Sequence, residues 1–250
     1  MSFFDSIQTC LTEQHDPLSL VASVFICGLG SFSGYALLTE TDRASGKRRR
    51  RLFVLCVATL ASTVWVTHFG ALLGYSDGIE LQISVGWTLL SLGLAALLYA
   101  AAAFQLLHAH ASPLRAALAA VTLTGAVGLM HFAGIQAYRT SATILWQTGF
   151  VALAVALCLG LSLVACLLYA CFDGLIRTLG SPIVFALSIA ALHFTAMSGM
   201  TLVPFGTTAP EITGSAWLRP LVEVGIVVII CGGSFAVAIW DRRRIRLRHV

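Results

Sequence analysis

Charged side chains are scarce in this sequence. Asp, Glu, Lys and Arg make up only 10% of the 250 residues, whereas apolar residues make up 58% and the mean hydropathy is +0.90. A soluble globular domain carries about 25% charged residues. The composition therefore excludes a soluble domain and indicates an integral membrane protein. The net charge of +4 does not indicate nucleic-acid binding, because the basic residues are confined to a few short segments.

Two further features are missing. No Lys or Arg precedes the first apolar segment, so the chain lacks the basic region of a cleavable signal peptide and this segment is expected to remain as a helix. The 7 cysteines do not form a disulfide framework, because all except Cys10 fall within or at the edge of an apolar segment. They are interpreted as small apolar residues of membrane helices.

The apolar residues are grouped into long runs. A membrane-spanning helix needs about 20 predominantly apolar residues, and seven segments meet this length: 18–38, 52–74, 83–107, 116–138, 144–171, 182–203 and 221–240. The sequence therefore predicts an all-α integral membrane protein with seven transmembrane helices. We expect one domain over residues 1–250, with a short basic cytoplasmic tail at 241–250 and no output domain.

The basic residues predict the orientation of this bundle. Every Lys and Arg except Arg139 and Arg219 lies after the first, third, fifth or seventh helix. The positive-inside rule places these segments in the cytoplasm, with the N-terminus outside and the C-terminus inside. The run 47–51 either only fixes this topology or also contacts anionic lipid headgroups.

Three His-Phe pairs recur at nearly equal spacing within the apolar segments, which suggests three internal repeats. They are His68-Phe69, His131-Phe132 and His193-Phe194. Their helices, the second, fourth and sixth, all run outwards. The three histidines are therefore expected to meet at one depth, close to the outer surface.

Each polar feature also has a purely structural interpretation. A single histidine in a membrane helix can serve only as a hydrogen-bonding group between helices. Three in repeated register favour a shared site, because ionisable groups inside the membrane usually mark function. Four further residues could belong to this site or serve only in packing or at the membrane interface: Tyr75, Tyr138, Met200 and Glu223. If residues 182–203 form one helix, His193, Met197 and Met200 lie along one stripe of it.

The quoted motifs resemble the MHYT family of bacterial integral membrane sensor domains. The best matches are Met130-His131-Phe132-Ala133-Gly134 and His193-Phe194-Thr195-Ala196-Met197, with Phe in place of the family's Tyr in all three copies. The resemblance implies a seven-helix sensor that binds copper through Met and His side chains and senses oxygen, carbon monoxide or nitric oxide. The ligands that it implies here are His68, Met130, His131, His193 and Met197.

Several alternatives stay open. Imidazole and thioether ligands favour copper, zinc also accepts three histidines, and haem could be held by His131 and His193. Copper transport is the second class of function, although the apolar halves of the histidine helices argue for a site that is closed towards the cytoplasm. No catalytic constellation is visible, so no enzyme activity is expected. The expected partners are the lipid bilayer of a bacterial cytoplasmic (inner) membrane, a diatomic gas, and a separate signalling protein or a second copy of the chain.

Overall fold

Six long helices make up most of the structure, a computed structural model that describes residues 3–75, 82–109, 112–139 and 142–204. These helices are α2 (Pro17–Asp42), α3 (Gly46–Leu73), α4 (Val85–Leu107), α5 (Pro113–Ile135), α6 (Thr148–Cys171) and α7 (Ser181–Ser198), the last continuous with a π-helical turn η1 (Ile176–Gly180). All six are long and apolar enough to cross a membrane. The predicted seventh helix at 221–240 lies outside the described residues, together with Glu223, Arg219 and the basic tail.

Local sequence signals set several helix starts. Prolines stand in the first turn of α2 and α5, where a missing N–H costs no hydrogen bond. Asp16 caps α2, because its carboxylate accepts a hydrogen bond from the Ser19 amide at 2.8 Å. Side chains of this type at the N-cap satisfy amides that the helix leaves free.

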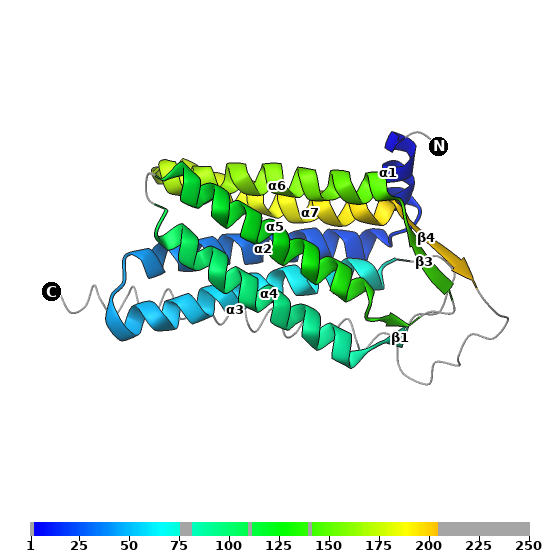
Figure 1. Ribbon diagram of the computed structural model, residues 1–250, viewed down its shortest axis with the longest axis horizontal. Coiled ribbons are helices and arrows are strands. Elements are labelled where there is room, and N and C mark those ends of the chain that lie inside the picture. The colour runs from blue at the N-terminus through cyan, green and yellow to red at the C-terminus, as the bar shows by residue number, and fades with distance from the viewer. Residues whose placement is uncertain (1–2, 76–81, 110–111, 140–141, 205–250) are drawn as a thin grey trace.

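The six helices form a closed ring in which each packs on its neighbours in the sequence and α7 returns to α2. They lie roughly parallel along the long axis of the molecule (Figure 1). The helices that carry the His-Phe pairs are therefore alternate members of the ring: α3, α5 and α7. Contacts of α5 with both α3 and α7 cross the ring and bring these three together.

One end of the bundle, here called the basic end, carries Lys47 and the arginines of the first turns of α3. Two ion pairs join elements there. Arg177 lies 3.0 Å from Asp42, and Arg48 lies 3.2 Å from Glu40. The Arg177 guanidinium also stacks on the Tyr169 ring at 4.1 Å. This end joins α2 to α3 and to the start of the α7 region.

The opposite end, here called the histidine end, holds short strands of the described residues (Figure 1). Strand β1 (Gln82–Ile83) pairs with β2 (Tyr138–Arg139), and β3 (Ala142–Trp146) pairs with β4 (Met200–Pro204), both antiparallel. The predicted helices at 83–107, 116–138, 144–171 and 182–203 overran these strands. Strand-favouring Thr, Ile and Trp in β3 and Thr and Val in β4 explain the difference. Met200 begins β4, so the prediction that it shares a helical stripe with His193 and Met197 is wrong.

Helix α2 lies very close to α3 because two glycines of α2 face α3. A Cβ built on Gly30 would overlap Thr63, and one on Gly34 would overlap Leu60. Glycines four residues apart allow two membrane helices to approach at backbone distance. The Cys56 thiol uses this proximity to donate a hydrogen bond to the Gly34 carbonyl at 3.3 Å.

A short helix lies outside the ring of six long helices, at the histidine end. Helix α1 (Phe3–Thr12) precedes α2 and packs on α7. Cys10 on its inner face is fully buried, whereas Phe4 is exposed. The segment between α1 and α2 is tied to the end of α3, since the Asp16 amide donates to the Gly74 carbonyl at 2.8 Å.

Candidate metal centre

The three histidines of the repeats lie at one depth, as the sequence analysis expected. His68, His131 and His193 stand four or five residues before the last residues of α3, α5 and α7, which are Leu73, Ile135 and Ser198. The helix that carries His193 begins at the turn from Ile176, earlier than the predicted start at residue 182.

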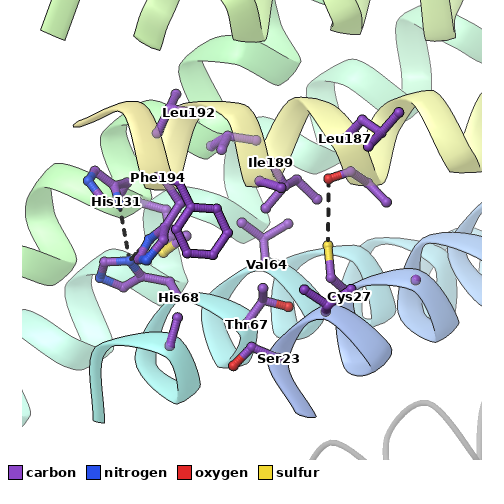
Figure 2. Close-up of a pocket in the computed structure, with 18 of the residues that line it drawn as sticks. Ser23, Cys27, Val64, Thr67, His68, His131, Leu187, Ile189, Leu192 and Phe194 are labelled. Carbon is purple, nitrogen blue, oxygen red and sulfur yellow. Dashed lines mark hydrogen bonds between the residues drawn. The ribbon is translucent and has the colours of Figure 1, made fainter. Parts of the chain in front are cut away.

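The imidazoles of these residues, here called the triad, face one another. Nδ1 of His68 lies 3.1 Å from Nδ1 of His131 and 3.4 Å from Nδ1 of His193. The three rings stand nearly perpendicular to one another, with centroids 4.8 to 5.5 Å apart. Figure 2 shows the His68 and His131 rings pointing at each other beside α7. Residues far apart in the sequence therefore converge on one point.

Hydrogen bonds alone cannot satisfy this arrangement. A neutral imidazole has one N–H and one lone pair, yet Nδ1 of His68 faces two other nitrogens. At most one of these two contacts can be a well-formed hydrogen bond. The Nε2 atoms of all three rings are also buried without a hydrogen-bond partner in the described part of the chain. Buried polar atoms without partners are costly, so this arrangement of rings is suited to bind a further group.

The Nδ1 atoms around His68 are spaced like the ligands of one metal ion. Ligands about 2.0 Å from an ion at tetrahedral angles lie about 3.3 Å from one another. The observed Nδ1 separations of 3.1 and 3.4 Å bracket this value. The candidate donor atoms of the triad all lie within 4.8 Å of one another, and each histidine is buried. A buried group of three histidines able to hold a metal is thus present.

The predicted methionine ligands occupy different surroundings. Met130 is buried and lines the same cavity as the triad. Met197 is also buried, but it packs in an apolar cluster with Cys10, Phe69, Tyr75 and Met200. The Tyr138 hydroxyl donates a hydrogen bond to the Leu72 carbonyl at 2.8 Å. The triad and Met130 are therefore brought together, and Met197 stays a predicted ligand.

An apolar cavity of about 220 Å³ adjoins the triad. Its walls come from α2, α3, α5 and α7 (Figure 2) and include Cys27, Val64, Thr67, Ala190 and Phe194. No Asp or Glu occurs among the described residues that line it. The volume exceeds that of several water molecules, each of which takes about 30 Å³ in the liquid. Small uncharged molecules could enter this space, and no Lys or Arg among the described lining residues would pair with an anion.

A fourth buried histidine, His15, was missed by the sequence analysis. It lies between α1 and α2, is only 3% exposed, and has its ring centroid 6.0 Å from that of His193. Burial lowers the pKa of His15, and its hydrogen bond to the Cys10 carbonyl offsets only part of this effect. The ring is therefore neutral near pH 7. It lies outside the apolar repeats and has no Phe after it, so the pattern gave no signal for it.

Comparison with known sequences decides the family. Residues 62–120 and 125–179 each match the sequence model of the MHYT family, described as a bacterial signalling protein N-terminal repeat. The chain belongs to the MHYT family. The two matched segments contain His68-Phe69 and His131-Phe132, and the third pair, His193-Phe194, lies outside both.

Relatives of this MHYT chain are bacterial signalling proteins. It is 35% identical over 92% of its length to an "Uncharacterized signaling protein" of Caulobacter vibrioides, covering 29% of that protein. It is 31% identical over 86% of its length to the cyclic di-GMP phosphodiesterase NbdA of Pseudomonas aeruginosa, again covering 29%. Identity to MucR of the same organism, a bifunctional diguanylate cyclase/cyclic di-GMP phosphodiesterase, is 24% over 93% of this chain and 35% of MucR.

The chain thus spans about a third of the length of the curated relatives it matches. The enzyme names of two of them describe proteins of which this MHYT chain resembles only a part. No solved structure matches the chain.

The close packing around the triad gives a test of its geometry. A Cβ built on Gly134 would lie 2.5 Å from Nε2 of His68, whereas a Cβ on Gly125 of the same helix meets nothing within 4 Å. Gly134→Ala is therefore expected to push the His68 ring out of place and to lower the metal affinity of the MHYT chain by about tenfold or more.

Gly125→Ala is the matched control for this substitution. It adds the same methyl group to α5 in open space and should leave metal affinity unchanged. Competition with a coloured chelator measures both affinities. Equal affinities of the two variants would contradict the arrangement of His68 against Gly134.

Proposed function

We propose that this chain is the sensor module of a bacterial signalling system and that the triad holds one copper ion near the outer face of the cytoplasmic membrane. The observation that carries this proposal is that Nδ1 of His68 lies 3.1 Å from Nδ1 of His131 and 3.4 Å from Nδ1 of His193 in a buried group of three histidines. Met130, beside the triad, and Met197 are the further ligands that membership of the family suggests.

The charge of the site favours Cu(I) over a divalent ion. Three neutral imidazoles would leave the full charge of the ion in an apolar region, and no carboxylate lines the adjoining cavity among the described residues. The cost of burying a charge is large and rises with the square of that charge. A monovalent ion is therefore much less costly here than Zn²⁺, and thioether sulfur also prefers Cu(I).

Haem fits the geometry less well. A bis-histidine haem needs two imidazoles on opposite faces of a macrocycle. The triad rings are nearly perpendicular, with nitrogens 3.1 to 3.4 Å apart, which leaves no gap for a porphyrin between them. Copper transport remains the alternative function for the same ion, and the apolar surroundings of the triad favour sensing over passage.

The apolar cavity supports a diatomic gas as the signal. Oxygen, carbon monoxide and nitric oxide are small and uncharged, and the cavity next to the triad is apolar. Because an ion at the triad would join α3, α5 and α7, a gas that binds the ion can shift these helices only if it binds one arrangement better than the other. The names of the relatives suggest that the output controls cyclic di-GMP, through a longer chain or a separate protein.

Infrared spectroscopy of carbon monoxide on the Cu(I)-loaded protein tests this proposal. One CO band that is absent without copper is expected. Ala190→Leu, which places a larger side chain at the cavity wall, should weaken CO binding by about tenfold, since a change of one methylene in an apolar pocket is worth about 1–3 kcal/mol. Its copper content should be unchanged.

Ala191→Leu serves as the control, since Ala191 is the next residue of α7 and does not line the cavity. Equal CO affinity in the two variants would show that gas does not reach the copper through the cavity. A wild-type protein that holds copper but gives no CO band would contradict gas sensing.

A further inference from the structure

His15 lies immediately beside the triad but does not belong to it. Its ring centroid lies 6.0 Å from that of His193, and it also contacts the edges of Tyr75 and Phe194, at 5.3 and 5.6 Å. The group of donor atoms within 4.8 Å of one another contains only the three triad histidines among the described residues. His15 is therefore a neighbour of the triad but not a member of it.

The hydrogen bonding of His15 leaves one nitrogen ready to bind a ligand. Its Nδ1–H donates to the Cys10 carbonyl oxygen at 2.7 Å. The neutral ring then carries its lone pair on Nε2, which is buried and has no hydrogen-bond partner in the described part of the chain. Histidines that bind metals characteristically donate the other N–H to a carbonyl or carboxylate in this way.

The distance between His15 and His193 suits transfer of an ion from one to the other. An ion about 2.0 Å from one nitrogen of each of two imidazoles places the ring centres about 6 Å apart. The observed separation is 6.0 Å. An ion held by His15 could therefore bind His193 before it leaves His15, without any helix moving.

His15 lies in the segment that joins α1 to α2, at the histidine end of the bundle. It precedes α2 and lies next to the last residues of α3, since it forms an isolated β-bridge with Tyr75. Helix α1 packs on α7 beside it. Cys10 has its Sγ 3.8 Å from Nδ1 of His15, but burial raises the pKa of this thiol. It therefore stays protonated, and the imidazole is the better ligand.

We propose that His15 is the capture ligand of this protein: its Nε2 binds an incoming Cu(I) ion and passes it to His193 of the triad. This inference rests on the proposed copper centre and adds a second, transient metal site to it. The transfer exchanges one Cu–N bond for another, so neither the oxidation state nor any proton changes. His15 is needed for the rate of loading and not for the final occupancy.

The sharpest variant is His15→Asn. An Asn amide can still donate to the Cys10 carbonyl from the position of Nδ1, but it has no atom in the place of Nε2. His108→Asn is the matched control, because Nδ1 of His108 makes the same kind of bond, to the Phe104 carbonyl at 2.7 Å, at the exposed basic end. His15→Phe is a second variant that keeps an aromatic ring against Tyr75 and Phe194.

The measurement is the rate of copper loading of the metal-free protein in detergent. Cu(I) is delivered from a coloured chelator, stopped-flow absorbance follows its loss, and the final copper-to-protein ratio is then determined. His15→Asn and His15→Phe are expected to load about tenfold more slowly than the wild type, with the same final ratio. His108→Asn should load at the wild-type rate.

The possible results distinguish failure of the capture role from failure of the copper centre. A wild type that takes up copper at the same rate as both His15 variants overturns the capture role and leaves the centre intact. A lower final ratio in His15→Asn also overturns it, because His15 would then be a permanent ligand. A wild type that takes up no copper overturns the centre itself, and the capture role with it.

Discussion

Replacing His68, His131 and His193 together by alanine is expected to abolish copper binding and to leave a folded helical bundle. The three imidazoles supply all the nitrogen donors of the triad, and their Nδ1 atoms converge at 3.1 and 3.4 Å. Without a metal, these buried rings leave polar atoms without partners, so their removal takes away unfavourable groups as well as packing. We expect at least a hundredfold loss of affinity. Copper-to-protein ratios and circular dichroism measure the two effects.

The control for this variant is His108→Ala, which removes an exposed histidine at the basic end and should keep its copper. Single replacements of His68, His131 or His193 should each lower affinity, and His68 should matter most, because its Nδ1 faces both other nitrogens. Stoichiometric copper in the folded triple variant would show that the ion binds elsewhere.

Gly34→Ala is expected to destabilise the bundle markedly. The added Cβ would overlap the buried Leu60 side chain of α3, including its Cγ at 2.6 Å. Either α2 moves away from α3 or Leu60 leaves its place. Overpacking of this kind costs about 1–3 kcal/mol, which is a large part of the stability of a membrane protein. The midpoint of thermal unfolding in mild detergent should fall by several degrees, by an amount that depends on protein size.

Gly28→Ala is the comparison for this prediction, because it makes the same change on α2 where a Cβ meets nothing within 4 Å. Alanine favours a helix over glycine by about 1 kcal/mol, so this control should be neutral or slightly stabilised. If both variants melt at the wild-type temperature, the close approach of α2 and α3 at Gly34 is not what holds the two helices together.

The membrane helices were predictable from the sequence because length and hydropathy alone identify them. Each of the six predicted segments that fall on described residues overlaps a helix able to cross a membrane. The helix ends were less predictable. β3 and β4 carry apolar residues such as Ile144, Trp146 and Met200, and hydropathy cannot separate a short apolar strand from the end of a membrane helix.

The triad was predictable because three His-Phe pairs share one register on helices that run in the same direction. His15 was not, because its place beside His193 depends on how α1 and the α2 cap fold back over the histidine end. The cavity beside the triad was also not predictable. It lies between α2, α3, α5 and α7, and only tertiary packing shows this.

The most direct test of the copper centre is the metal content and absorption spectrum of the protein purified in mild detergent, before and after addition of Cu(I). The triad predicts close to one copper per chain, no Soret band, and no copper in the variant that lacks all three histidines. A Soret band would assign the site to haem. Absence of both copper and haem, even after Cu(I) is added, would contradict a metal centre at His68, His131 and His193.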